Sequence, residues 1–227
     1  MRLKGKSAIV TGGASGFGAG IARKFISEGA RVMIVDLNGN AATALATELG
    51  AVAHTADVSK NTDVKAMTEA ALSAFGSVDI LVNNAGITHL PQPMDEVEED
   101  EFDRVLAVNA KSVFLTAKHL VPHMRAAGKG NILNVASTAG ISPRPRLSWY
   151  NASKGWMITA TKSMAVELAP DGVRVNALNP VAGETPLLKS FMGEDTPEMR
   201  AKFLSTCLLY TSPSPRDATL SRMPSSA

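Results

Sequence analysis

The sequence predicts an α/β fold, a doubly wound parallel sheet in three α/β/α layers. The first observation is that short apolar runs alternate with stretches of helical periodicity, as in parallel sheets with helices on both faces. The second is that a glycine or a polar residue follows most of these runs. The expected strands cover residues 7–11, 31–35, 51–56, 79–82, 131–135 and 173–178. The expected helices cover residues 19–28, a stretch starting near residue 40, 60–75, 99–127 and 150–168.

Length and composition fit one large globular domain. The 227 residues are enough for a sizeable core, and 45% hydrophobic with 19% charged residues is an ordinary balance. A net charge of +2 gives no reason to expect nucleic acid or a membrane surface as a partner. The apolar run after residues 1–7 is too short for a signal peptide or a membrane span. The single cysteine, Cys207, fits a reducing compartment, so we expect a cytoplasmic protein.

A glycine-rich loop follows the first expected strand. It contains Gly12, Gly16 and Gly18, with Ser15 and Phe17 among them, and leads into a helical stretch. Glycines here let the backbone approach a pyrophosphate, whose charge then faces a helix N-terminus. The spacing G-x-x-x-G-x-G is a relative of the dinucleotide-binding fingerprint rather than a match to it. An ordinary strand–helix turn is therefore the alternative.

An acidic residue, Asp36, ends the second expected strand. It follows Gly12 at close to the spacing of about 20 residues at which an acid meets the adenosine ribose of a dinucleotide. A carboxylate there accepts from the ribose hydroxyls and repels the 2′-phosphate of NADP, and neither Leu37 nor Asn38 is basic. The pattern favours NAD. The alternatives are an aspartate that begins the turn or caps the helix starting near Asn40.

The third and fourth strands also end in residues that suit a close nucleotide contact. Asp57 and Val58 follow the third strand, and residues 83–86, Asn-Asn-Ala-Gly, follow the fourth. Such residues are equally typical of any tight turn. Further along, Asn109 lies within a helical stretch, where it is either a chance surface residue or has a polar task inside. Pro122 is expected to kink or interrupt that helix.

Tyr150 and Lys154 form an i,i+4 pair, so they share one face of the last long helix. A phenol has an ordinary pKa of about 10, and a neighbouring ammonium lowers that pKa toward a value useful for proton transfer. Ser137, at the end of the preceding strand, could hydrogen-bond the same reacting oxygen. Such pairs also occur by chance on solvated helices. His119 and His123 share a helix face too, but no carboxylate–histidine motif accompanies them and no metal site is expected.

These candidates converge on one edge of the predicted sheet. Ligands of such folds bind outside the carboxyl ends of the strands, and these ends are followed by Gly12–Gly18, Asp36, Asp57, Asn84, Ser137 and Pro180. Jointly the motifs resemble the short-chain dehydrogenase/reductase family over roughly residues 3–205. Residues 11–18 look like its cofactor loop, 83–86 like its fourth-strand motif and 180–185 like its nicotinamide-side loop. Four further residues look like the catalytic tetrad of the family: Asn109, Ser137, Tyr150 and Lys154.

Two places depart from the family pattern. Phe17 stands where the family usually has Ile or Leu. The usual Pro-Gly is Pro180-Val181 here, and Gly183 comes later.

The resemblance implies a Rossmann-like fold and reversible hydride transfer between a nicotinamide cofactor and a small-molecule secondary alcohol or ketone. Asp36 favours NAD over NADP as that cofactor. The resemblance also implies that Tyr150 passes the proton and that Ser137 holds the substrate oxygen. Lys154 would bind the nicotinamide ribose and lower the tyrosine pKa, and Asn109 would position a water. Cofactor contacts are implied for Gly12, Ser15, Gly16, Phe17, Gly18, Asp36, Asp57, Val58, Asn84, Tyr150, Lys154, Pro180, Gly183 and Thr185.

The resemblance leaves the substrate open. Similarity extends to proteins described as 3-oxoacyl-carrier-protein reductases and sugar dehydrogenases. Arg144 and Arg146 flank the expected pocket and either favour an anionic substrate or are solvated loop charges. A non-catalytic dinucleotide-binding module is the alternative function, and an inactive truncated fragment is another. The full-length form is expected to be a homodimer or homotetramer, with no nucleic acid or membrane partner.

Residues 207–227 differ in character from the rest of the chain. They show no sustained periodicity and are rich in serine and proline, as disordered tails are. They also resemble the translation of a transposase-type sequencing adapter. We therefore expect a dinucleotide-binding domain at 1–206 that is truncated at its C-terminus, and a non-native tail at 207–227. The resemblance implies that a further helix and a seventh strand are absent, which would leave the sixth strand as an exposed edge.

Overall fold

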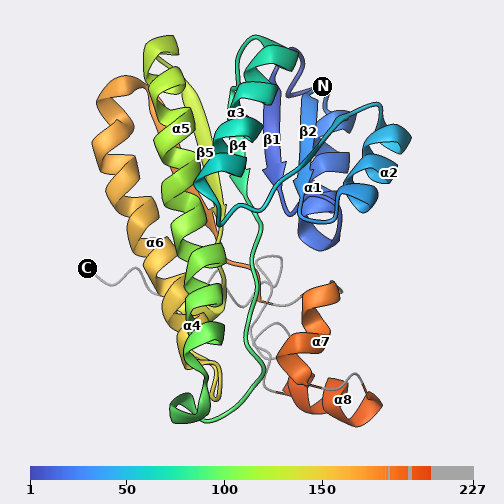
Figure 1. Ribbon diagram of the computed structural model, residues 1–227, viewed down its shortest axis with the longest axis vertical. Helices are drawn as coiled ribbons and strands as arrows, with labels where there is room; N and C mark the ends of the chain where they lie inside the picture. Colours follow the sequence, from blue (N-terminus) through green and yellow to red (C-terminus); the bar gives the residue numbers. More distant parts are fainter. Residues whose placement is uncertain (182, 184, 194–195, 206–227) are drawn as a thin grey trace, which may run out of the picture.

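The computed structural model describes residues 1–181, 183, 185–193 and 196–205. Its centre is a parallel sheet of six strands in the order β3-β2-β1-β4-β5-β6 (Figure 1). The direction in which strands are added reverses between β1 and β4, the point at which such sheets bind ligands. The predicted fold class is confirmed, and every predicted strand is present: β1 (Ser7–Thr11), β2 (Arg31–Asp36), β3 (Val52–Thr55), β4 (Ile80–Asn83), β5 (Gly130–Val135) and β6 (Val173–Leu178).

Helices cover both faces of the sheet (Figure 1). One face carries α1 (Gly16–Ser27) and α2 (Gly39–Leu49). The other carries α3 (Asn61–Phe75), α5 (Ser112–Ala127) and α6 (Ser148–Leu168). Short 3₁₀ turns complete the connections: η1 (Met94–Glu96), η3 (Thr138–Gly140) and η4 (Ala169–Asp171).

The two faces of β1 supply the two halves of the core. Ala8 and Val10 pack in the cluster that includes α1 and α2, whereas Ile9 packs in the cluster that includes α3 and α5. All five residues of β1 are buried, as expected for a central parallel strand covered on both sides. This burial on both faces explains why the strands are continuous apolar runs in the sequence.

A line of buried hydrogen bonds ties two helices to the sheet. Asn83 Nδ2 donates to Asn134 Oδ1, and Asn134 Nδ2 donates to Thr161 Oγ1 of α6, both at 2.8 Å. Thr116 Oγ1 of α5 lies 3.0 Å from Asn83 Oδ1. None of these four side chains is more than 5% exposed. The chain of polar groups fixes α5 and α6 relative to β4 and β5.

The helical stretch 99–127 is not one α-helix. It consists of α4 (Glu99–Leu106), a π turn, η2 (Ala107–Lys111), and α5. Pro122 was expected to kink or interrupt this stretch, and it does not interrupt it, since α5 continues through this residue to Ala127. The irregularity lies instead at η2, and π turns in helices are frequent at functional sites.

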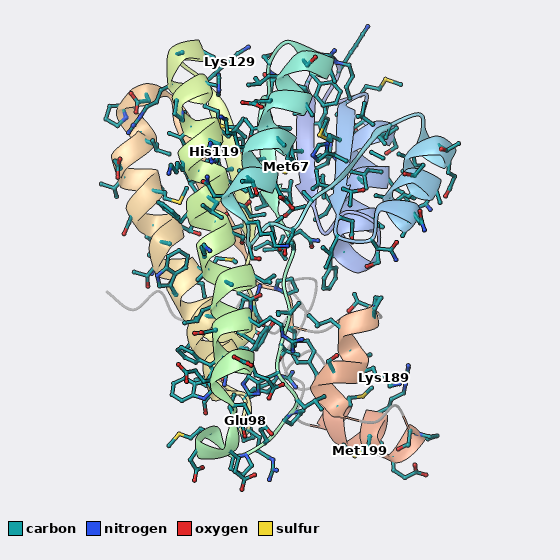
Figure 2. The ribbon with its side chains drawn as sticks, in the orientation of Figure 1. Met67, Glu98, His119, Lys129, Lys189 and Met199 are labelled. Carbon is teal, nitrogen blue, oxygen red and sulfur yellow. The ribbon has the colours of Figure 1, made fainter. Side chains whose placement is uncertain are left out.

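Two helices that the sequence did not predict follow β6. They are α7 (Pro186–Met192) and α8 (Pro197–Ser205). Both lie beyond the carboxyl ends of the strands, toward which the strand arrows point (Figure 1). Met199 of α8 and Lys129, just after α5, therefore lie toward opposite ends of the molecule (Figure 2).

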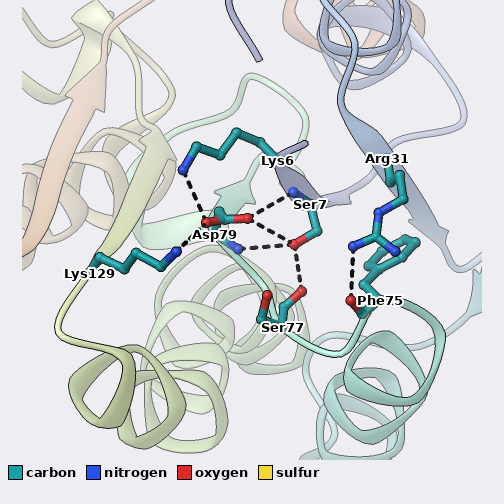
Figure 3. Close-up of polar contacts among 7 residues, drawn as sticks. All are labelled: Lys6, Ser7, Arg31, Phe75, Ser77, Asp79 and Lys129. Atoms are coloured by element: carbon teal, nitrogen blue, oxygen red, sulfur yellow. Dashed lines mark hydrogen bonds and ion pairs between the residues drawn. The ribbon is translucent and has the colours of Figure 1, made fainter. Parts of the chain in front are cut away.

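At the amino ends of the strands, a partly buried acid has several partners (Figure 3). Asp79 Oδ2 accepts from the Ser7 N–H at 3.1 Å, and its Oδ1 lies 3.3 Å from Lys6 Nζ and 3.6 Å from Lys129 Nζ. The Ser7 hydroxyl donates to the Ser77 carbonyl at 2.5 Å. Burial pushes the Asp79 pKa upward, but the hydrogen bonds from Ser7 and Lys6 outweigh it, so the pKa is below its ordinary value.

The predicted tail, residues 207–227, lies outside the described residues. Within the described part of the sheet, β6 pairs only with β5, and Leu178 is 47% exposed on this edge strand. None of the helices in the described ranges is long and apolar enough to cross a membrane.

Candidate active site

A cavity of about 440 Å³ lies at the carboxyl ends of the strands. It is bounded by the loop after β1, the ends of β2 to β5 and the segment from β6 into α7. The sequence-predicted residues that line it are Gly12, Ser15, Gly16, Phe17, Asp36, Asp57, Val58, Asn84, Ser137, Tyr150, Lys154, Pro180, Gly183 and Thr185. Of the predicted set, only Gly18 and Asn109 are not in the lining, and both hold residues that are.

The glycine-rich loop is held by Asn84. The Asn84 Nδ2 donates to the carbonyls of Thr11 and Gly12, each at 2.9 Å. Gly18, in the first turn of α1, packs directly against this pair, and a Cβ there would overlap the Gly12 carbonyl and lie 2.5 Å from Asn84 Nδ2. The loop therefore stays close to the sheet, and the N-terminus of α1 faces the cavity, where backbone N–H groups favour an anion.

Thr11, the first residue of the stretch that resembles the family's cofactor loop, is a supporting residue to which the sequence assigned no role. Its hydroxyl accepts from the backbone N–H groups of Asn84 and Ala85, each at 3.1 Å, and donates to the Val82 carbonyl at 3.2 Å. One side chain thus ties the end of β1 to the turn after β4. A hydroxyl at the end of an otherwise apolar run was the available signal.

Two carboxylates lie at one end of the cavity. Asp36 is fixed by the main chain, since its Oδ2 accepts from the Ala14 N–H at 3.1 Å and its Oδ1 from the Asn38 N–H at 3.0 Å. The N-cap of α2 is Asn38, so Asp36 begins the turn without capping the helix itself. Asp57 accepts from the Ser59 hydroxyl at 2.6 Å, and this bond helps to hold the Asp57 pKa below its ordinary value.

At the other end of the cavity, Ser137, Tyr150 and Lys154 come together from β5 and α6. All three are nearly buried, with exposed fractions of 7%, 4% and 4%. Lys154 Nζ donates to the Val135 carbonyl at 3.0 Å and lies 5.9 Å from the centre of the Tyr150 ring. The Ser137 hydroxyl accepts from the Ala139 N–H at 3.1 Å and hydrogen-bonds with Tyr150. The predicted grouping of these residues is thus present.

The electrostatics of this group differ from the sequence-based expectation. Burial raises the pKa of Tyr150 above its ordinary value, and the hydrogen bond with Ser137 and the charge of Arg144 oppose the rise without cancelling it. Burial also lowers the pKa of Lys154 to about 8. The expected net lowering of the tyrosine pKa is therefore wrong here, because desolvation outweighs the groups that favour the charged form.

Asn109 is inside the protein, at 0% exposure, in the π turn η2. Its Oδ1 accepts from the Ile87 N–H and its Nδ2 donates to the Ile87 carbonyl, each at 2.9 Å. The Nδ2 also donates to Ser153 Oγ at 2.9 Å, and Ser153 Oγ donates to the Tyr150 carbonyl at 2.7 Å. The polar task of Asn109 is to join the loop after β4 to the helix that carries Tyr150.

Helix α7 closes the tyrosine end of the cavity. Its Phe191 packs edge-on against the Tyr150 ring, with the ring centres 5.1 Å apart. Phe191 was not among the predicted site residues because α7 was not a predicted helix. A signal was present in Thr185-Pro186, the N-cap and first residue of that helix, since proline is frequent at the first position of helices.

The sequence pattern of the short chain dehydrogenase family matches residues 6–195. The chain belongs to the short-chain dehydrogenase family. It is 50% identical over 211 residues to 4-formylbenzenesulfonate dehydrogenase of Comamonas testosteroni, a match covering 90% of this chain and 84% of that protein. It is 42% identical over 202 residues to 2-dehydro-3-deoxy-L-rhamnonate dehydrogenase (NAD(+)) of a Sphingomonas species, covering 88% and 81%.

A similar solved structure is described as 3-ketoacyl-(acyl-carrier-protein) reductase from Brucella melitensis complexed with NADH. It shares 54% identity and a TM-score of 0.83, over 84% of this chain and 81% of that one. As a short-chain dehydrogenase, this chain is an NAD(P)-dependent oxidoreductase that interconverts an alcohol and a carbonyl compound. Its substrates are small molecules. The cavity fits such a cofactor, since it joins a glycine loop at a helix N-terminus, a fixed carboxylate and a buried tyrosine.

Proposed function

We propose that this short-chain dehydrogenase uses NAD to interconvert a secondary alcohol and a ketone, with Ser137, Tyr150 and Lys154 as its catalytic residues. The observation that carries this proposal is that the three side chains meet at one end of a single cavity whose other end is formed by Asp36. The cavity would hold the adenosine half beside Asp36 and Asp57, and the nicotinamide half beside Tyr150.

Tyr150 is the proton donor in the direction of reduction. Because burial raises its pKa, its hydroxyl keeps its proton at neutral pH and is available to a carbonyl oxygen in the cavity. Ser137, hydrogen-bonded with the same phenol, holds that oxygen. The cofactor supplies the hydride chemistry when bound, and the protein supplies orientation and electrostatics. In the direction of oxidation, Tyr150 takes the proton back.

Lys154 has a second task beside the tyrosine. Its pKa of about 8 leaves the side chain largely protonated at neutral pH. An ammonium close to the Tyr150 ring stabilises the negative charge that develops when the phenol gives up its proton. We assign it the nicotinamide ribose as a binding partner. The side-chain amide of Asn109 hydrogen-bonds to Ile87 and Ser153. Asn109 would therefore position a proton-relay water indirectly, by fixing the main chain around Ile87.

Asp36 supports NAD in preference to NADP. Its carboxylate is held by two backbone N–H groups, so it cannot turn away from the cavity without losing both. A 2′-phosphate would therefore meet a fixed negative charge. No described residue lining this end of the cavity is basic, and Asp57 adds a second acid there.

The test is Tyr150→Phe, which removes only the hydroxyl oxygen. We expect turnover with a panel of ketones to fall by about three orders of magnitude, in the range of acid–base catalysis. NADH should still raise the thermal midpoint of the variant and NADPH should not. Trp149→Phe, an aromatic change at the next residue, should keep its turnover. Comparable turnover in Tyr150→Phe would overturn the catalytic assignment, and stronger binding of NADPH would overturn the use of Asp36.

We further propose an anionic carbonyl compound as the substrate. The two relatives named above act, by their names, on a sulfonate and on a sugar acid. In this chain Arg144 is half-buried among exposed neighbours, and its charge reaches the Tyr150 hydroxyl. Its backbone is fixed, because Asn151 Nδ2 donates to the Arg144 carbonyl at 2.7 Å.

The matched pair Arg144→Gln and Arg146→Gln tests this substrate class, since Arg146 is exposed in the same loop. We expect the first change to raise KM for an anionic aldehyde or ketone about tenfold, the weight of one charge-assisted contact. It should leave KM for a neutral ketone unchanged. The second change should alter neither. Equal effects of the two changes would support the alternative of solvated loop charges.

We also propose a cytoplasmic location, from the single cysteine, and a homodimer or homotetramer, from the family resemblance. Light scattering of the purified protein would test the assembly. A monomer at micromolar concentration would contradict it.

A further inference from the structure

Phe17 and Gly183 meet across the mouth of the cavity. Phe17 is the second residue of α1, is 40% exposed and lines the cavity. Gly183 lies in the segment between β6 and α7. A Cβ built on Gly183 would lie 2.5 Å from Phe17 Cζ and 2.9 Å from Cε1. The phenylalanine ring therefore occupies the space that any other residue at position 183 would need.

A second contact lies directly beside the first. A Cβ built on Gly16 would be 3.0 Å from Thr185 Cγ2 and 3.1 Å from its Cβ. Two successive residues of the glycine-rich loop thus approach two nearby residues of the segment after β6 too closely for a side chain on either glycine. All four line the cavity.

These contacts join segments that the sheet holds apart. The loop follows β1 and the other segment follows β6, and β4 and β5 lie between these strands. Asn84 and Ser137 follow β4 and β5 at the same edge. The contact therefore crosses over the middle of the cavity, between the acidic end and the tyrosine end.

We propose that Phe17 and Gly183 are a matched pair that positions the cofactor, the ring of Phe17 supplying the apolar wall that a side chain at 183 would otherwise supply. The inference rests on the proposed function, since it requires a dinucleotide in this cavity. The wall lies where the pyrophosphate-binding loop meets the nicotinamide end, so it sets how far the nicotinamide half reaches toward Tyr150. Phe17 is also one of the two places where this sequence departs from the family pattern, and Gly183 lies two residues after the other, Val181.

If Phe17 and Gly183 are a matched pair, each single substitution should be harmful and the double substitution should restore the fit. Gly183→Val places a branched side chain into the ring of Phe17 and must push the two segments apart. Phe17→Ile removes part of the wall and leaves the cofactor loosely held. The double variant Phe17→Ile/Gly183→Val exchanges large for small on one side and small for large on the other, so it should rebuild the wall from the opposite segment.

The experiment compares NADH affinity, by fluorescence titration, and the KM and kcat for NADH in the wild type, both single variants and the double variant. We expect Gly183→Val to weaken NADH binding about tenfold, at the low end of what overpacking causes. The double variant should recover to within about threefold of the wild type, as coupled neighbours do. The substitutions should alter KM for NADH more than kcat. The thermal midpoints of the variants should rank in the same order as their NADH affinities but differ little from one another.

Phe114→Ile/Gly183→Val is the matched control, because Phe114 is an exposed aromatic residue on α5 that does not line the cavity. It should show no recovery. Should Gly183→Val fail to fold, Gly183→Ala replaces it, since its Cβ meets the same ring atoms. Additive effects of the two substitutions, or equal recovery with Phe114→Ile, would overturn this inference while leaving the proposed function standing. A wild type that binds no NADH would overturn both.

Discussion

Asp79 and Lys154 are both nearly buried ionisable residues. Asp79 lies at the amino ends of the strands, here called the amino edge of the sheet, and Lys154 lies at their carboxyl ends, the carboxyl edge. At the amino edge, Asp79 has two lysines, a backbone N–H and a hydroxyl around it, and its pKa moves in the direction that favours the charge (Figure 3). At the carboxyl edge, the one described hydrogen bond of Lys154 goes to a backbone carbonyl, and its pKa moves against the charge.

The opposite effects on the two charges indicate that the amino edge contributes to stability and the carboxyl edge to function. Partners around Asp79 turn burial of a charge into a contribution to stability. Burial of the Lys154 charge at the other edge costs stability. Because Lys154 Nζ has one described hydrogen bond, to the Val135 carbonyl, its charge is available to a ligand. Perturbed groups of this second kind are typical of functional sites. Substitutions at the two edges should therefore have opposite consequences for stability and activity.

The largest expected effect is at Lys154. Lys154→Met should lower turnover by at least about 100-fold, because it removes a charge beside the reacting phenol. It should also raise the free energy of unfolding at neutral pH, by about 1 kcal/mol, since relief from burying a charge exceeds the loss of one hydrogen bond. Steady-state kinetics and chemical denaturation measure the two effects. Lys162→Met, on the exposed side of the same helix, should change neither. A lower free energy of unfolding in Lys154→Met than in the wild type would contradict the inference that the charge of Lys154 costs stability.

Asp79 should show the reverse behaviour. Asp79→Ala leaves the buried Ser7 N–H without its carboxylate partner, so we expect a loss of about 2–3 kcal/mol in the free energy of unfolding. Turnover per folded molecule should stay at the wild-type value. Asp171→Ala is the control, because Asp171 pairs with Arg125 at 2.7 Å but is 34% exposed and should cost well under about 1 kcal/mol. Lost turnover in folded Asp79→Ala would show that the edges are coupled.

The smallest effects are in the pH dependence of stability, where the two edges should give slopes of the same sign in different windows. The pKa of Asp79 is lowered by folding, so its contribution is present above its ordinary pKa of 3.8 and is lost as pH falls through the folded value. The advantage of the wild type over Asp79→Ala should shrink in this acid range.

The pKa of Lys154 is lowered from 10.5 to about 8, so between these values the unfolded chain binds the proton and the folded chain does not. Stability gains from this group as pH rises through that window. The difference between Lys154→Met and the wild type should therefore narrow from pH 8 to 10.5. Thermal midpoints across both ranges would test this, and a constant difference would contradict the assigned pKa.

The strands and their carboxyl-end residues could be predicted because central parallel strands are continuous apolar runs, with the ligand-binding residues directly after them. That reasoning located Gly12, Asp36, Asn84 and Ser137 at one cavity. It could not give the direction of the Tyr150 pKa, because spacing on a helix shows which residues are neighbours but not how deeply a later segment buries them. The segment that covers Tyr150 includes Phe191, far along the chain.

Contacts between distant segments were the other limit. Asn109 was left open between a surface residue and a polar task inside, and nothing local to it names Ile87 and Ser153 as its partners. Phe17 and the late glycine, Gly183, were both noted in the sequence, but only the fold shows that the two residues lie close together.

The π turn η2 has a consequence for the length of the chain between α4 and α5. A helical residue advances by about 100° around the axis, so the wider turn at 107–111 sets α4 and α5 out of phase with one another. Deleting a single residue there would let the stretch become an uninterrupted α-helix. It would also swing Asn109 away from Ile87 and Ser153, although every side chain of the site would still be encoded. In this part of the protein the number of residues is as constrained as their identity.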